Sequence, residues 1–406
     1  MKAPIVLTQS EAAIINILRK NDCASRAEIT NLTCWSKAKT SQEVTSLIAK
    51  GFLVEVGDGA SQGGRKPRLL QINSKLGFIV GIDIGATSLE IALADTACNI
   101  LQRVAEPADV RQSAEEVLGR CRDLIMEMVI KQNIHAEEIL GIGVGVPGPV
   151  NFKTGMLIAP PLIPDWEEYP IRQFFKQSFT SSIVVVDNDV NIMALGEQSA
   201  NHAEEIDNFL MIKIGTGIGC GIMANKKIHR GSDGSAGDIG HICVDKQGPI
   251  CLCGNRGCLE AMAAGPAIAE RAMEAAQNGK SEVLSRMMEE NNGVLTPEDV
   301  NAACREGDGA SLEIIRSSGQ MIGEVLASLV NFFNPSHIFI GGGIANFGNH
   351  LLIAIKRTVL RRSLPLATQN LVINFSHTGA DAGILGAITL ARDYLFTIEN
   401  NHCISH

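Results

Sequence analysis

One histidine and three cysteines in the segment 231–260 constrain this chain more than any other feature of its sequence. His241, Cys251, Cys253 and Cys258 follow one another as His-x9-Cys-x-Cys-x4-Cys. One imidazole and three thiolates suit tetrahedral Zn²⁺, and the intervening glycines let the chain turn around one ion. Because four ligands leave no open position, the spacing predicts a structural zinc site. The alternative is a group of buried free thiols beside an unrelated histidine.

The length and composition favour a soluble protein of several domains. A chain of 406 residues is too long for one compact core and suggests about three domains. No apolar run reaches the roughly 18 residues that a membrane-spanning helix needs, so we expect no membrane span. The N-terminus carries no signal pattern and the other cysteines have no regular spacing, which together predict a cytoplasmic location.

Charge is divided unevenly along the chain. Residues 1–75 hold 11 Lys and Arg against 6 Asp and Glu, a balance of +5. The rest holds 24 basic and 38 acidic residues, a balance of −14, and the two parts sum to the net charge of −9. A basic head on an acidic body indicates a module that binds a polyanion, joined to a part that handles small molecules.

The basic head has the pattern of a winged helix-turn-helix. Three helices are expected at Ser10–Lys20, Ser25–Thr33 and Ser36–Lys50, each beginning at a serine cap, followed by a β-hairpin with strands at Phe52–Val56 and Leu69–Ile72. Residues 1–75 are therefore expected to bind operator DNA. The expected DNA contacts are Ser36, Lys37, Lys39, Thr40 and Gln42 of the third helix and Arg65, Lys66 and Arg68 of the hairpin, although each basic residue alone could be an ordinary surface charge.

Three glycine-rich turns follow apolar strands and could bind the phosphates of ATP with Mg²⁺. None of them matches the P-loop or dinucleotide-binding patterns, and glycines are also common in ordinary hairpins. The candidate nucleotide-binding residues are Asp83, Gly85 and Thr87 in the first turn, Gly215, Thr216, Gly217 and Gly219 in the second, and Gly342 and Gly343 in the third.

A fourth strand, predicted from Ile183, runs into the polar sequence Asp-Asn-Asp-Val-Asn at 187–191. Carboxylates at the end of a buried strand are costly unless they are solvated, paired or used in function. Asp189 is the candidate general base, with Asn188 and Asn191 as hydroxyl or backbone partners. Asp187 is interpreted as the cap of the following helix. Asp238, His241 and Glu260 at the edges of the cysteine-rich loop are suited to binding hydroxyl groups.

These motifs together resemble the ROK family of repressors, open reading frames and kinases, over nearly the whole chain. The resemblance rests on DIGATS (83–88), VPGPVN (146–151), DNDVN (187–191), GTGIGCG (215–221), AGDIGH (236–241), CLCGNRGCLE (251–260) and GGGI (341–344). Within the family, the N-terminal head resembles that of the sugar-responsive repressors for xylose, N-acetylglucosamine and glucose uptake.

The resemblance implies an α/β, actin-like (ribonuclease-H-type) two-lobed sugar kinase fold behind the winged helix-turn-helix. It places the first lobe at 76–188 with 380–406, and the second at 189–379 with the zinc loop 241–258. It also implies that sugar hydroxyls are bound by Gly148, Asn188, Asp189, Asp238, His241 and Glu260. His241 would bind Zn²⁺ through one ring nitrogen and sugar through the other.

Two features depart from the usual family pattern. The family usually has Glu where this chain has Asp238, and a carboxylate shorter by about 1.5 Å favours a different sugar or a bridging water. The phosphate loops are intact here, with Ala86 as a mild change, whereas many repressors of the family have eroded ones.

The sequence is therefore compatible with two different functions. The first is a repressor, a homodimer or homotetramer, whose heads lose the operator spacing when a sugar or sugar phosphate occupies the cleft. The second is an ATP-dependent sugar kinase, bifunctional with DNA binding, in which Asp189 deprotonates the attacking hydroxyl. The head favours the repressor, and the intact loops leave the kinase open.

Overall fold

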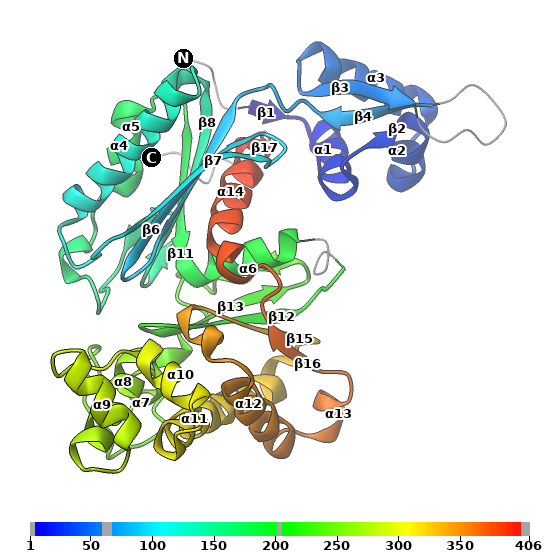
Figure 1. The fold of residues 1–406 in the computed structure, drawn as a ribbon. Helices are drawn as coiled ribbons and strands as arrows, with labels where there is room; N and C mark the ends of the chain where they lie inside the picture. Colours follow the sequence, from blue (N-terminus) through cyan, green and yellow to red (C-terminus); the bar gives the residue numbers. More distant parts are fainter. Residues whose placement is uncertain (1–4, 59–66, 201–204, 399–406) are drawn as a thin grey trace.

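The structure, a computed structural model, describes residues 5–58, 67–200 and 205–398. Its N-terminal part is a three-helix unit with a small sheet of strand order β2-β4-β3, set apart from the rest of the chain (Figure 1). The helices of this head are α1 (Gln9–Asn21), α2 (Arg26–Thr33) and α3 (Lys37–Ala49). Its strands are β2 (Ala24–Ser25), β3 (Leu53–Asp58) and β4 (Arg68–Ile72). Three helices followed by two strands of a hairpin are consistent with the winged helix-turn-helix that the sequence predicts.

Side-chain caps fix where the helices of the head begin. Ser25 and Ser36 cap α2 and α3, as predicted. The first helix begins earlier than expected, because Thr8 rather than Ser10 is its cap and forms a capping box with Glu11. Glu11 also accepts a hydrogen bond from Ser46 and pairs with Lys50, which joins α1 to α3.

One expected DNA contact is wrong. Thr40 is 1% exposed, and the Thr30 hydroxyl of α2 donates to its hydroxyl over 3.0 Å. Thr40 lies four and seven residues before Val44 and Leu47, so it shares their inward face on a helix of 3.6 residues per turn. Its hydroxyl binds α2 and does not face DNA.

The body contains two five-stranded sheets with the same topology. The first has the order β11-β8-β5-β6-β7 and the second the order β14-β13-β12-β15-β16. In each, an antiparallel meander is extended by two parallel strands, so the two sheets form an internal structural duplication.

The strands of the first sheet are β5 (Phe78–Ile84), β6 (Ser88–Asp95), β7 (Ile100–Pro107), β8 (Ile139–Val146) and β11 (Ile183–Asn188). Those of the second sheet are β12 (Phe209–Ile214), β13 (Ile218–Ala224), β14 (Lys227–Ile228), β15 (His337–Gly341) and β16 (Val372–Phe375). A short hairpin of β9 (Val150–Asn151) and β10 (Met156–Leu157) follows β8.

Helices cover the outer faces of the two sheets (Figure 1). The first sheet carries α4 (Ala114–Lys131) and α5 (Ile171–Ser178). The second lobe carries α7 (Leu259–Ala263), α8 (Gly265–Gln277), α9 (Glu282–Glu290), α10 (Pro297–Arg305), α11 (Gly309–Phe333), α12 (Asn349–Arg362) and α13 (Pro365–Thr368). Single 3-10 turns lie at Ala136–Glu138, Pro164–Trp166, Ile239–His241, Gly343–Phe347 and Gly379–Asp381.

Two helices, α6 (Asp189–Ser199) and α14 (Ala382–Leu395), cross between the sheets (Figure 1). Glycines allow their backbones to touch. A Cβ added at Gly196 would lie 1.9 Å from the Ala382 carbonyl oxygen, and one at Gly386 would lie 1.6 Å from that of Ile192. This close crossing joins the two lobes next to the start of α6, which carries Asp189.

The head is attached to the body by more than the connecting chain. Strand β1 (Ile5–Leu7) pairs in parallel with β17 (Phe396–Ile398), which directly follows α14. Arg19 of α1 donates to the carbonyl of Arg392 and lies 3.4 Å from a carboxylate oxygen of Asp393. The expected domain boundaries after residues 75, 188 and 379 remain predictions.

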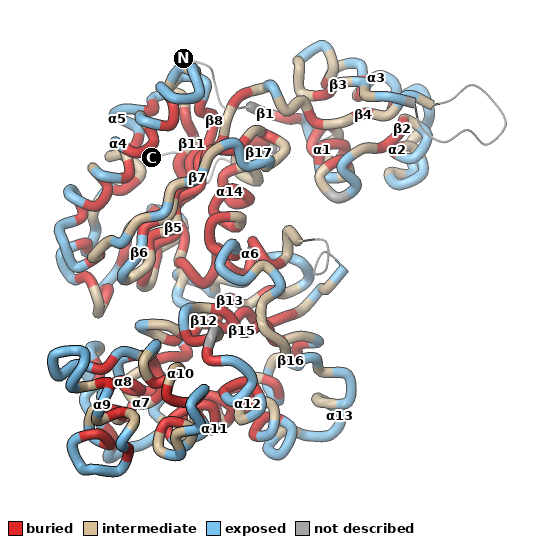
Figure 2. The backbone as a smooth tube through the Cα atoms, viewed as in Figure 1, coloured by how far each residue is buried: buried red, intermediate tan, exposed pale blue. Residues whose placement is uncertain are grey.

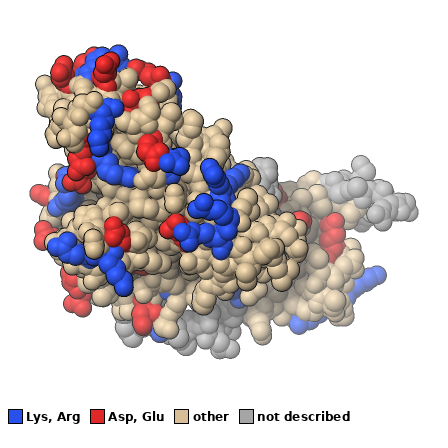
Figure 3. Space-filling model, turned by 90° about the horizontal axis from the view of Figure 1, so that it is seen from below, with Lys and Arg blue, Asp and Glu red and all other residues tan. Residues whose placement is uncertain are grey.

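Buried residues gather on the sheets and on the helix faces turned toward them, as the colours of Figure 2 show, while the outer faces of the helices are exposed. On the face drawn in Figure 3, basic side chains lie in separate groups among acidic and uncharged ones. Within the described residues, no helix is both long and apolar enough to cross a membrane.

Candidate functional site

A cleft of about 640 Å³ lies between the two lobes. This size is within the range typical of small-molecule sites. Strand ends and glycine turns from both sheets meet there, so residues far apart in the sequence line one cavity. All six residues expected to bind sugar line it, namely Gly148, Asn188, Asp189, Asp238, His241 and Glu260.

Most candidate nucleotide-binding residues line the same cleft: Gly85, Thr87, Gly215, Thr216, Gly217, Gly219 and Gly343. Asp83 and Gly342 are not among its lining residues. Gly342 has a structural reason to be glycine, because its φ is +90° and an added Cβ would lie 2.4 Å from the Ile214 carbonyl oxygen.

Asn188 and Asp189 are placed at the junction of β11 and α6. The Asn188 side chain is the N-cap of α6: its oxygen accepts from Val190 N at 2.9 Å, and its nitrogen donates to the Gly148 carbonyl at 2.9 Å. The interpretation of Asp187 as the cap is therefore wrong. Asp187 is buried and is paired instead with Arg230.

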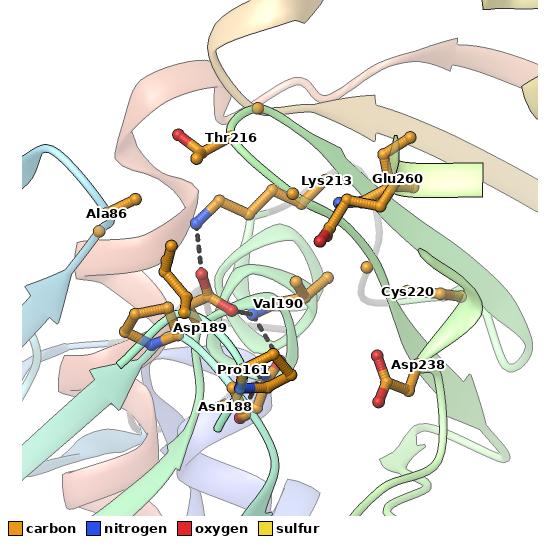
Figure 4. Close-up of a pocket in the computed structure, with 18 of the residues that line it drawn as sticks. Ala86, Pro161, Asn188, Asp189, Val190, Lys213, Thr216, Cys220, Asp238 and Glu260 are labelled. Carbon is orange, nitrogen blue, oxygen red and sulfur yellow. Dashed lines mark hydrogen bonds and ion pairs between the residues drawn. The ribbon is translucent and has the colours of Figure 1, made fainter. Parts of the chain in front are cut away.

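Three further polar side chains line the other side of the cleft, where Figure 4 shows Asp238 and Glu260. Glu260 accepts a hydrogen bond from Ile218 N through Oε2, and burial raises the pKa of its carboxyl and that of Asp238. His241 Nε2 lies 3.8 Å from Asp238 Oδ1. A ligand in the cleft would thus meet carboxylate, amide and imidazole groups, which suit a molecule with several hydroxyls.

The other ring nitrogen of His241 faces the cysteines. The ligand atoms of His241, Cys251, Cys253 and Cys258 all lie within 4.8 Å of one another. The Cys253 and Cys258 sulfurs are 3.7 Å apart, and His241 Nδ1 is 3.6 Å from the Cys251 sulfur. A tetrahedral ion with Zn–S of about 2.3 Å and Zn–N of about 2.0 Å sets ligand atoms roughly 3.6–3.8 Å apart. The four residues can therefore hold a metal ion.

The thiols have unequal proton affinities. Burial raises the pKa of Cys258 to about 12 and also raises that of Cys251. Although burial opposes it, the Asn255 N–H and the two neighbouring cysteines lower the pKa of Cys253 to about 7. Three thiolates at this spacing repel one another, and a bound cation would compensate that repulsion.

Two residues of the site were missed by the sequence reasoning. Lys213 Nζ lies 2.5 Å from Asp189 Oδ2 inside the cleft (Figure 4). Arg230 pairs with Asp187 at 2.6 Å across the lobes. A signal for Lys213 did exist, because a lysine within the apolar strand that enters the glycine loop must have a partner or a function.

On the N-terminal head, Ser36, Lys37, Lys39 and Gln42 are exposed at the start of α3. Ser36 caps the helix, and Lys39 Nζ lies 4.3 Å from the centre of the Trp35 ring. Arg68 is exposed and pairs with Glu55 of the neighbouring strand. Arg65 and Lys66 lie outside the described residues.

Comparison with known proteins decides the family. Residues 79–394 match the ROK family. The chain belongs to the ROK family. Its match covers both lobes and every cleft residue named above, so the resemblance inferred from the motifs is confirmed.

The ROK relatives differ in whether they include the head. A xylose repressor of Caldicellulosiruptor bescii is 33% identical over 379 residues, which cover 93% of this chain and 94% of the repressor. A ROK family transcriptional regulator, described as a homolog of the E. coli MLC protein, has a TM-score of 0.79 and 26% identity, covering 95% of this chain and 97% of that one. A ROK glucokinase of Streptomyces griseus, in complex with glucose and AMPPNP, has a TM-score of 0.67 and 29% identity, covering 78% of this chain and 100% of the kinase.

Proposed function

We propose that this protein is a transcriptional repressor that binds operator DNA through residues 1–75 and releases it when a sugar occupies the cleft. The observation that carries the proposal is the combination, in one chain, of an exposed start of α3 in the three-helix head and a cleft lined by carboxylate, amide and imidazole groups. The similar repressor and transcriptional regulator extend over the head, whereas the whole glucokinase matches only 78% of this chain. A cytoplasmic homodimer or homotetramer fits this role.

The charges in the cleft favour an uncharged sugar over a sugar phosphate. Four carboxylates line it, those of Asp189, Asp238, Glu260 and Glu298. Among the described lining residues, Lys213 alone is a lysine or arginine, and it is already paired with Asp189. A phosphate would therefore meet carboxylates without an unpaired basic side chain, which disfavours it electrostatically.

A ligand screen tests this function against the kinase alternative. The expected result is a rise in melting temperature with one or more uncharged sugars among xylose, glucose and N-acetylglucosamine, because a ligand that binds the folded state stabilises it. Their phosphates should give a smaller rise. The same sugars with ATP and Mg²⁺ should yield no sugar phosphate. Steady ATP-dependent turnover of the stabilising sugar would favour the kinase.

The metal proposed for the His241 cluster is Zn²⁺, in a structural role. The donor set and the 3.7 Å and 3.6 Å spacings support this ion. Zn²⁺ on Nδ1 would fix the tautomer of His241 and leave Nε2–H to donate toward Asp238 or a sugar oxygen. The metal would then act on the sugar site by orienting a binding residue.

Lengthening one carboxylate should change the sugar preference. We expect Asp238→Glu to weaken binding of the sugar that stabilises the unaltered protein by roughly 10-fold, because the extra methylene pushes the carboxylate into the cleft. Isothermal titration calorimetry measures the effect. Asp233→Glu, an exposed position in the same loop, is the matched control and should leave the affinity unchanged. Equal affinities for the two variants would exclude Asp238 from the sugar site.

The exposed start of α3 leads to a separate prediction about DNA binding. Lys37→Ala should weaken binding to a DNA site selected by the protein from a random pool, and should reduce the slope of log K against log salt by about one. Fluorescence anisotropy at several salt concentrations measures both. Lys280→Ala, an exposed lysine of the second lobe, is the control. An unchanged slope in Lys37→Ala would show that this lysine does not contact a phosphate.

A further inference from the structure

Lys213 brings a positive charge into the cleft from an otherwise apolar strand. It lies in β12, between the fully buried Ile212 and Ile214. Its side chain extends into the cleft toward the start of α6 (Figure 4). The Nζ atom lies 2.5 Å from Asp189 Oδ2, and the two side chains are 24% and 10% exposed. This part-buried ion pair places a positive charge directly against Asp189 in the cleft.

Both carboxylate oxygens of Asp189 accept a hydrogen bond within the protein. Oδ2 accepts from Lys213, and Oδ1 accepts from the backbone N–H of Val190 at 2.9 Å. A carboxylate that takes a proton from a substrate hydroxyl becomes neutral. Protonation of Asp189 would therefore leave the Lys213 ammonium without its closest counter-ion, which makes proton abstraction by Asp189 unfavourable.

Asp83 is a second carboxylate whose charge acts on the same ammonium. It stands near the end of β5, and its Oδ1 is buried without a hydrogen-bond partner. Burial raises the pKa of Asp83 to about 6, opposed by the charge of Lys213. Although burial opposes it, Asp189 and Asp83 together raise the pKa of Lys213. The charge of Asp83 thus acts on an ammonium that Asp189 contacts directly.

A divalent metal would compete with this lysine for the same oxygens. Mg²⁺ binds carboxylate oxygens at about 2.0–2.1 Å with near-octahedral geometry, and Asp83 is the acidic residue from which the sequence predicts such a site. A lysine ammonium 2.5 Å from Asp189 excludes the ion from that oxygen by contact and by charge. The residues present therefore do not fit Mg²⁺ at Asp83 and Asp189.

We infer that Lys213 is the resident cation of the cleft, a side chain that takes the place of a divalent metal at Asp189. The cleft then binds its ligand without Mg²⁺ and holds Asp189 as a paired anion rather than as a general base. This inference deepens the proposed function and rests on the cleft being a ligand site.

Binding of Mn²⁺ alone, followed by electron paramagnetic resonance on the zinc-loaded full chain, tests the inference. The unaltered protein should bind no more Mn²⁺ than Asp83→Asn does. Lys213→Met should bind about one Mn²⁺ per chain more than the unaltered protein, because the two carboxylates lose their cation. Asp83→Asn added to Lys213→Met should abolish the gain, and Lys213→Arg should show none. Lys280→Met is the matched control for loss of a lysine.

Two results would overturn the inference. One is a Mn²⁺ ion on the unaltered protein that Asp83→Asn removes. The other is a Lys213→Met protein with native circular dichroism and no added Mn²⁺. If Lys213→Met does not fold, Mn²⁺ binding by the unaltered protein is compared with that by Asp83→Asn. Equal Mn²⁺ binding by these two proteins supports the inference. None of these results depends on DNA release by sugar, so the inference and the proposed function fail separately.

Discussion

Loss of the metal from the cluster of His241, Cys251, Cys253 and Cys258 is expected to lower the melting temperature more than any other single change. The loop between His241 and Cys258 contributes little to a core, because Ile242, Ile250 and Leu252 are 42%, 64% and 71% exposed. A structural Zn²⁺ supplies on the order of 10 kcal/mol in small domains. We expect chelation to cost more than about 10 °C, measured by differential scanning calorimetry.

The same cluster offers a matched pair of cysteine variants. Cys258→Ser removes a fully buried sulfur that is 3.7 Å from Cys253, and should lower both the zinc content and the melting temperature. Cys243→Ser changes an exposed residue whose backbone pairs with that of Cys258 in a β-bridge but which does not belong to the cluster, and should change neither. Purified protein without zinc, with a melting temperature insensitive to chelator, would contradict the proposed zinc site.

The second large effect is expected from Arg230, which connects the lobes. Its guanidinium binds Asp187 Oδ2 at 2.6 and 2.8 Å, and its Cζ lies 3.8 Å from the centre of the Phe152 ring. Asp187 has a side chain only 2% exposed. Arg230→Met leaves a buried carboxylate without its ion-pair partner, which costs about 3–5 kcal/mol. We expect the melting temperature to fall by about 6 °C or more.

Arg230 also lies where a sugar signal could pass to the head. It lines a second cavity, of about 450 Å³, together with Asn16 and Arg19 of α1. Its partner Asp187 accepts a hydrogen bond from the backbone of Asn188, which lines the sugar cleft. Arg230→Met should therefore also reduce the change in DNA affinity that sugar produces.

A surface ion pair provides the control for Arg230. Arg111 pairs with Asp109 at 2.8 Å, with side chains 72% and 45% exposed. Arg111→Met should change stability by no more than about 0.5 kcal/mol, because solvent screens an exposed pair. Arg230→Lys should lie between the two Met variants, since it keeps the charge and loses the two-point contact. A melting temperature unchanged by Arg230→Met would show that the lobes do not depend on this pair.

The fold class can be predicted from the sequence because the strongest patterns in the sequence are local. Serine caps set the starts of α2 and α3, and apolar strands followed by glycines mark the two matching sheets. Thr40 is polar, but its helical spacing from Val44 and Leu47 places it on the inward face of α3, so its polarity alone does not predict exposure. Thr8 and Ser10 both precede the helical pattern of α1, so both are candidate caps. Only the capping box with Glu11 identifies Thr8 as the cap.

The sequence predicts those parts of the site in which residues close in sequence are also close in space. The cysteine cluster and the run from Asp187 to Asn191 are of this kind. Lys213 and Arg230 find their carboxylate partners 24 and 43 residues away. Such pairs depend on how the two lobes meet, which the α6–α14 crossing determines and no local pattern records.

The most direct test of sugar-controlled DNA binding is an anisotropy titration of a labelled DNA site, selected by the protein, with and without the sugar that raises the melting temperature. Saturating sugar is expected to lower DNA affinity by about 10-fold or more, a typical coupling between two sites. The phosphate of that sugar should have a smaller effect at the same concentration. DNA affinity that stays the same while the sugar saturates the cleft would contradict the central claim.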